Sequence, residues 1–219
     1  MALAIVAIVA FGFGRTIDAK LIHPPAPRPT ILYVHALLSA TWVSIFLAQT
    51  LLIANGVYAW HRRVGIAGLV VGGALPVVGA ITAVAMAAIN LRSGFHDAPA
   101  FLVLPIFYML SFAAIFGLAV VAIVRRTFEI HRRLMFIATC LLTVAAFARF
   151  PGLPVGTWDV FTDALIVCGA MRDYIVTKTI HPVYRFALPL LVAGQIAANA
   201  IYFTHPSWWL GLAHAMMHA

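Results

Sequence analysis

The stretch VGIAGLVVGGALPVVGAITAVAMAAI, residues 64–89, decides the fold class because it carries no charged side chain. An α-helix needs about 20 mostly apolar residues to cross the hydrocarbon core of a bilayer, so this stretch predicts a transmembrane helix. Its glycines, among them Gly65, Gly68, Gly72 and Gly79, lie near one face and predict a central helix with close neighbours.

Similar apolar runs extend over most of the chain and predict an all-α, polytopic membrane bundle. The 219 residues are 64% hydrophobic and 9% charged, against about 25% charged in soluble domains. A globular protein of this size cannot hide so much apolar surface from water. The composition excludes a soluble enzyme, a nucleic-acid module and a disordered tail. We expect a single membrane domain over 1–219 with about seven spans, at 1–17, 30–57, 64–90, 99–124, 132–150, 156–176 and 183–204, and an interfacial tail at 205–219.

The basic residues predict the orientation of this bundle. Of the 14 Lys and Arg residues, nine lie in or beside the gaps after the second, fourth and sixth expected spans. The positive-inside rule places these gaps in the cytoplasm, where their side chains would meet anionic lipid headgroups. We expect the N-terminus outside the cytoplasm and retained, because Met1–Gly14 has no basic residue before its apolar run.

A short sequence echo predicts repeated helix pairs. The segments AWHRRVG at 59–65 and EIHRRLM at 129–135 each place His-Arg-Arg at the start of an expected span, and IHPVYR at 180–185 is a degenerate third copy. The pattern favours a parallel internal repeat.

Polar side chains inside an apolar span are costly and are candidate functional groups. In the second span, His35, Ser39, Trp42 and Gln49 follow one another at steps of 4, 3 and 7 residues and share one helical face. The stripe indicates either the lining of an outward-opening cavity or a packing surface whose polar groups bond to neighbouring helices.

A second polar group is expected at the outer ends of the spans. Asp159 and Asp163 are four residues apart and share a helix face, and Arg149 precedes them by one turn-rich segment. We expect an Arg149–carboxylate ion pair, either as a structural clamp or as part of a ligand pocket with His35 and His96. In the last span, Gln195 and Asn199 are also four residues apart and are expected to bond across helices.

The histidines raise the question of haem, and the sequence leaves the ligand pair open. A b-type haem could take two imidazoles from different helices, with Arg side chains on its propionates. His61 and His131 satisfy this at the inner end, and His35 with His96 is the alternative pair. The His-Arg-Arg segments are equally typical of interfacial anchoring. We expect no structural metal site and no redox dithiol, because Cys140 and Cys168 lie in separate apolar runs.

Several of these motifs together resemble a widespread group of uncharacterised bacterial multi-span membrane proteins. The motifs are FGFGRT at 11–16, the His35–Trp42–Gln49 series, HRRVG at 61–65, HRRLM at 131–135 and ARFP at 148–151. The resemblance covers most of residues 11–154 and implies a helical fold in the bacterial inner membrane, without an activity.

The sequence therefore predicts an inner-membrane protein with an outward-facing polar pocket for a small molecule or redox cofactor, with haem and quinone as candidates. The alternatives are a transporter or channel, and a non-catalytic accessory subunit that binds other membrane subunits. Whether the protein is an enzyme stays open, because no nucleotide-binding, nucleophile-elbow or zinc-protease motif occurs.

Overall fold

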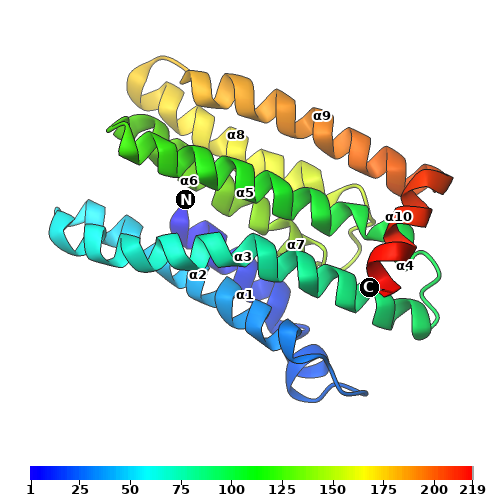
Figure 1. Ribbon diagram of the computed structural model, residues 1–219. Coiled ribbons are helices and arrows are strands. Elements are labelled where there is room, and N and C mark those ends of the chain that lie inside the picture. The colour runs from blue at the N-terminus through cyan, green and yellow to red at the C-terminus, as the bar shows by residue number, and fades with distance from the viewer. Residues whose placement is uncertain (219) are drawn as a thin grey trace.

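A computed structural model describes residues 1–218 and shows an elongated bundle of helices (Figure 1). No strand occurs in this described part of the chain. Its elements are α1 (Ala2–Gly14), the π-helical turn η1 (Asp18–Ile22), α2 (Thr30–Ala54), α3 (Tyr58–Arg92), α4 (Ala98–Phe101), α5 (Val103–Val124), α6 (Phe128–Leu142), α7 (Val144–Phe147), α8 (Trp158–Thr177), α9 (Pro182–Thr204) and α10 (Ser207–His218).

Five helical segments are long and apolar enough to cross a membrane, which confirms the predicted helical membrane bundle. They correspond to the expected spans at 30–57, 64–90, 99–124, 132–150 and 183–204. The expected first span is the 13-residue α1, whose rise of about 20 Å is less than the hydrocarbon thickness. The expected sixth span is the 20-residue α8, which carries four charged side chains. A total of seven spans stays a prediction.

Three antiparallel hairpins, α2–α3, α5–α6 and α8–α9, run in the same sense and turn at the same end of the bundle (Figure 1). Each of these turns contains one residue in the left-handed region: Gly56 (φ 70°), Arg126 (φ 58°) and Lys178 (φ 58°). We call this the hairpin-turn end. In the tail, α10 packs on α3 and α4, and the Trp209 indole Nε1–H donates to the Pro99 carbonyl at 3.0 Å. The last residue of the expected tail, Ala219, lies outside the described residues.

The direction of α1 bears on the predicted orientation. The last turn of α1 lies beside Arg149, whose guanidinium carbon is 4.2 Å from the centre of the Phe13 ring. In Figure 1 the N-terminus lies nearer to the hairpin-turn end than the rest of α1 does. Nine basic residues gather at or near that same end. The side of the membrane on which the N-terminus lies stays a prediction.

The glycine face of α3 receives the polar stripe of α2. A β-carbon at Gly72 would lie 2.5 Å from the Trp42 ring, so the two helices approach more closely than any larger residue allows. Equivalent contacts pair Gly65 with Gln49, Gly68 with Ile45 and Gly79 with His35. The stripe is therefore a packing surface along most of its length.

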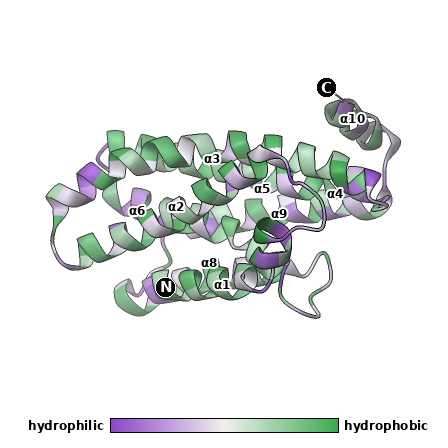
Figure 2. Ribbon diagram, turned by 90° about the horizontal axis from the view of Figure 1, so that it is seen from below, coloured by the Kyte–Doolittle hydropathy of each residue, from purple (hydrophilic) through white to green (hydrophobic). Residues whose placement is uncertain are grey.

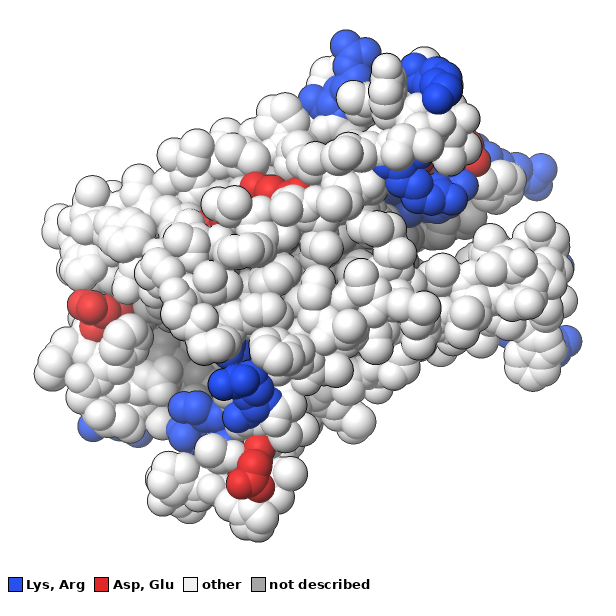
Figure 3. All heavy atoms as spheres, turned by 180° about the vertical axis from the view of Figure 1, so that it is seen from behind, with Lys and Arg blue, Asp and Glu red and all other residues white. Residues whose placement is uncertain are grey.

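The outer surface is apolar around the middle of the bundle and charged at its ends. Val70, Leu110 and Leu190, near the middle of α3, α5 and α9, are 68%, 65% and 75% exposed, and hydrophobic residues predominate along the long helices in Figure 2. On the face seen in Figure 3, Lys and Arg gather toward the two ends. An exposed apolar belt between charged ends is the surface that a bilayer requires.

Candidate functional site

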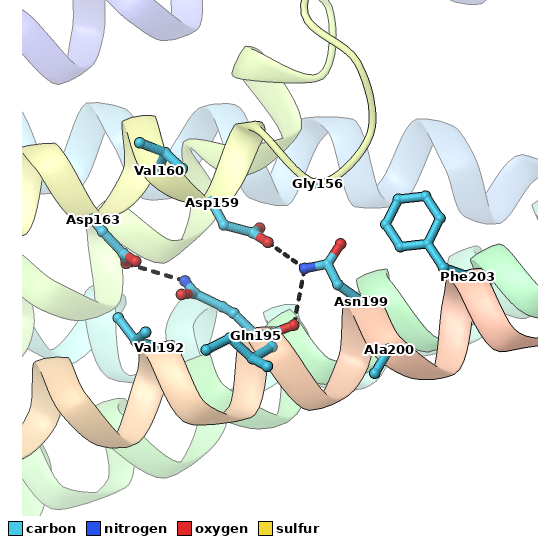
Figure 4. A pocket seen from close by; sticks show the side chains of 10 residues that line it. Gly156, Asp159, Val160, Asp163, Val192, Gln195, Asn199, Ala200 and Phe203 are labelled. Carbon is cyan, nitrogen blue, oxygen red and sulfur yellow. Dashed lines mark hydrogen bonds between the residues drawn. The ribbon is translucent and has the colours of Figure 1, made fainter.

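A polar cluster lies between α8 and α9, near the end opposite the hairpin turns (Figure 4). The Asn199 amide nitrogen donates to Asp159 Oδ2 at 2.5 Å and to the backbone carbonyl of Gln195 at 2.9 Å. The Gln195 amide nitrogen donates to Asp163 Oδ1 at 3.1 Å. The two amides and two carboxylates each recur after four residues, so each pair projects from one helical face toward the other. The predicted cross-helix bonding of Gln195 and Asn199 is confirmed.

A third helix closes the inner side of this cluster. The Tyr108 hydroxyl on α5 donates to Asp159 Oδ1, and it accepts from the Gln195 amide nitrogen at 3.3 Å. Tyr108 is 3% exposed, so its ring forms the floor under the carboxylates. The network fixes Asp159 with two donors, whereas Asp163 has one donor among the described residues.

The cluster lines an open groove with a volume of about 420 Å³, within the usual range for small-molecule sites. Gly156, Asp159, Asp163, Gln195 and Asn199 supply its backbone and polar atoms, and apolar residues complete it. Its rim is apolar and exposed: Val160, Ile196 and Phe203 are 65%, 66% and 62% exposed. In a bilayer such a rim faces lipid tails, so the groove is open sideways to the membrane.

The groove carries two carboxylates without a compensating cation. In the described part of the chain, no Lys, Arg or His forms an ion pair with Asp159 or Asp163. The side-chain carbonyl oxygen of Asn199 is buried and has no donor there either. Uncompensated anionic and acceptor groups in an apolar setting are costly. The Asn199 oxygen and the unbonded oxygen of Asp163 are therefore the groups of this cluster that can still accept a hydrogen bond.

Arg149 does not reach these carboxylates, so the predicted ion pair is wrong. Its guanidinium donates to the Ala145 carbonyl, one turn back on the same segment, and stacks over the Phe13 ring of α1. The helix α1 passes within backbone contact of α7, because a β-carbon at Gly12 would lie 2.5 Å from the Ala146 carbonyl oxygen. Because of this close approach, the Arg149 guanidinium lies against the Phe13 ring and not against a carboxylate, as the sequence suggested.

The remaining members of the expected outer pocket do not join the groove. His35 contacts α3 near Gly79, and its Nδ1 is buried without a partner. His96 is exposed in the turn before α4. Trp42 is 1% exposed and packs edge-to-face on Phe112 with ring centroids 5.2 Å apart. Of the expected pocket residues, only Asp159 and Asp163 line the groove.

Gln49, His61 and His131 each lie toward the hairpin-turn end, and Gln49 contacts His61. The Gln49 amide nitrogen donates to the His61 carbonyl at 3.1 Å. The His131 Nδ1 lies 2.9 Å from the Ala119 carbonyl and must donate to it. These residues are separate from the α8–α9 groove.

A buried ion pair at the hairpin-turn end has no counterpart in the sequence predictions. The Arg133 Nε donates to Asp173 Oδ2, joining α6 to α8, and both side chains are 5% exposed. The Arg133 Nη1 also bonds to Glu129 at 2.5 Å. Burial lowers the pKa of His181, and the positive charge of Arg133 lowers it further. The neutral imidazole can then accept from the Val183 amide at 3.2 Å and cap α9.

Tyr108 of the groove and Asp173 of the buried ion pair could not be found from the sequence alone. Tyr108 lies in an uninterrupted apolar run, and nothing in its local pattern distinguishes it from a core aromatic residue. Asp173 follows Arg172 near the end of α8, where a charged pair is typical of a helix end at the membrane surface. The structure distinguishes Asp173 from such a surface residue, because the register of α8 turns its side chain inward to Arg133.

Comparisons of the whole chain with protein-family models, with curated proteins and with solved structures found no match. The function is therefore argued from the two polar groups of the bundle themselves.

Proposed function

We propose that the protein is a membrane-embedded binding protein whose α8–α9 groove takes the head group of a quinone or quinol from the bilayer. The groove opens sideways between exposed apolar side chains, which suits a ligand with a long apolar tail. Its floor is polar, which suits a head group with two oxygen functions. The geometry of the groove supports binding of the head group. Electron transfer to or from the bound quinone would be the task of a partner subunit.

The observation that carries this proposal is the pair of carboxylates without a cation partner in the described chain. Asp163 accepts only from the Gln195 amide among the described residues, so it has room to accept a further hydrogen bond from a ligand. A protonated carboxyl donates to a quinone carbonyl, and a carboxylate accepts from a quinol hydroxyl. Two such groups match the two protons that distinguish a quinol from its quinone.

The charge distribution supports an orientation for this site. With the Arg-rich hairpin-turn end in the cytoplasm, the groove lies in the outer half of the bilayer and the C-terminus lies outside. Together with the resemblance described above, this favours the bacterial inner membrane. The transport alternative has less support, because the polar stripe of α2 packs on the glycine face of α3. The alternative of a non-catalytic accessory subunit is compatible with the proposed groove, because such a subunit can hold a quinone for its partner.

Replacing Asp163 by asparagine is expected to weaken binding of a short-chain quinol about tenfold or more. The asparagine keeps an oxygen for the Gln195 amide but removes the charge, and hydrogen bonds to charged groups contribute about 1.5–3 kcal/mol. The measurement is titration of the full chain in lipid nanodiscs. The readout is quenching of tryptophan fluorescence, because Trp158 adjoins Asp159 at the start of α8.

Asp18→Asn is the matched control, because Asp18 is exposed and pairs with His23 outside the bundle. This control should bind the quinol as the native protein does. Equal affinities for the native protein and Asp163→Asn would contradict the proposal. Saturable binding of a lipophilic cation such as tetraphenylphosphonium, with no binding of quinol, would replace the quinone class by organic cations.

A further inference from the structure

A second groove lies between α8 and α9, closer to the hairpin-turn end, with a volume of about 350 Å³. Its lining comes from residues 167–174 of α8 and 184–189 of α9, with Ile180 between them. Apart from the Arg185 guanidinium and the hydroxyls of Tyr174 and Tyr184, the side chains of this lining are apolar. The groove of the proposed function is called the first groove below, and this one the second groove.

The two grooves follow one another along the same pair of helices. The Asp163–Gln195 hydrogen bond, and the equivalent bond four residues away on each helix, set the antiparallel register of α8 and α9. Continued for seven residues from Asp163 and Gln195, this register places Ala170 opposite Leu188. Both of these residues line the second groove, so the packing of the first groove continues into the second.

The lining is continuous from one groove to the next. On α8 it passes from Asp163 to Val167, and on α9 from Val192, which lies beside Asp163 in Figure 4, to Pro189. Residues three or four apart lie on the same helical face, so both grooves open on the same side of the α8–α9 hairpin. Met171 is 57% exposed, so the lipid-facing rim also continues beside the second groove.

The polarity of the lining changes along the hairpin, which selects a ligand with a polar head and an apolar tail. From Asp163 to Tyr174 the helix rises about 16 Å. A prenyl unit adds four main-chain carbons, about 4–5 Å when extended, so this length matches about three or four units. The two grooves together therefore fit a head group and the first part of a prenyl tail.

Basic and aromatic side chains end the second groove near the hairpin turn. Arg185 is exposed and forms no ion pair within residues 1–218, and Tyr174 is 54% exposed. Such side chains are typical of the headgroup boundary of a bilayer. A tail longer than the groove would have to leave it at this point.

We infer that the second groove holds the tail of the ligand whose head group lies in the first groove, so that the site selects quinones with a prenyl tail over tailless or short-tailed ones. This inference rests on the proposed function, because it gives a place to the tail of the same ligand. Lipid tails are as apolar as the groove, so the groove selects the tail by its shape and length and not by its hydrophobicity.

The test is photolabelling of the full chain in lipid nanodiscs with a quinone that carries a diazirine at the end of a tail of about three prenyl units. The label is expected on residues 167–174 or 180–189, the segments of the second groove. Unlabelled quinol with the same tail should displace it. A phospholipid with a diazirine at the end of its acyl chain gives the comparison, because its label should spread over the exposed faces of the long helices.

Val167→Phe narrows the second groove, because Val167 is part of its lining. This variant should lose the displaceable tail label and the preference for the long-tailed quinone over one with a single prenyl unit. Val176→Phe is the matched control, because Val176 lies on the same helix, is 67% exposed and does not line either groove. The control should keep both the label and the preference.

The outcomes separate this inference from the proposed function. Tail label that spreads over the long helices, or that unlabelled quinol does not displace, would overturn the inference while a displaceable head-group label in the first groove keeps the proposed function. Equal affinities of the native protein for the long-tailed and the single-unit quinone would overturn it in the same way. Absence of displaceable label from both kinds of probe would remove the proposed function and the inference with it.

Discussion

Asp173→Ala is expected to lower the free energy of unfolding by about 3–5 kcal/mol, the usual effect of removing one member of a buried ion pair. The substitution leaves the Arg133 guanidinium buried between α6 and α8, where its side chain is 5% exposed. Glu129 offers only partial compensation, because its own side chain is 66% exposed. The measurement is unfolding in mixed micelles, followed by circular dichroism as the fraction of SDS rises.

Two further variants separate loss of the ion pair from general damage. The double substitution of Arg133→Met with Asp173→Leu should recover most of the stability, because replacing both members of a buried pair is often neutral. Asp18→Ala removes the exposed pair with His23 and should cost less than about 1 kcal/mol. An Asp173→Ala variant no less stable than Asp18→Ala would show that α6 and α8 are not joined as described.

Gly72→Ala is expected to destabilise the bundle by about 1–3 kcal/mol through overpacking. Its β-carbon would lie 2.5 Å from the Trp42 ring and 2.6 Å from the Phe116 ring, and both rings belong to the core between the repeats. Either α2 must move away from α3 or both rings must leave their positions. The change should appear in the midpoint of unfolding and in the near-ultraviolet circular dichroism of Trp42.

The adjacent glycine provides the control for this prediction. A β-carbon at Gly73 would meet no atom within 4 Å, so Gly73→Ala should leave the bundle unchanged or slightly more stable, given the higher helix propensity of alanine. If the two variants have the same unfolding midpoint, the close contact of α2 and α3 at Gly72 is wrong.

The long helices could be predicted from the sequence because a helix that crosses a bilayer needs only a long run of apolar residues. A run of apolar residues without charges is sufficient, as residues 64–89 show. Two expected spans do not meet this requirement, so whether they cross the membrane stays a prediction. The helix α1 is short, and α8 carries Asp159, Asp163, Arg172 and Asp173.

The repeat could also be predicted, because His-Arg-Arg recurs after 70 residues. The direct contact of Trp42 with Phe112 could not be predicted, because the sequence does not say which faces of two hairpins meet. Helix register within the bundle decides this.

The candidate site was predicted only in part, since its contacts depend on that register. The four-residue spacing correctly placed Asp159 with Asp163, and Gln195 with Asn199, each on one face. The sequence suggested Arg149 as the nearest cation, but Arg149 turns back to its own segment and to Phe13. Proximity along the chain therefore predicted the wrong partner for the two carboxylates. Their hydrogen-bond donors on α9 lie 32 and 40 residues further along the chain.

The most direct test of the α8–α9 groove as the ligand site is photolabelling of the full chain in nanodiscs with an azido-quinone, followed by peptide mapping. The label is expected on residues 156–163 or 192–203, the segments that line the groove. An excess of unlabelled quinol should displace it, and Asp163→Asn should reduce it while Asp18→Asn does not. Label that lies mainly on other segments, or that unlabelled quinol does not displace, would contradict the account.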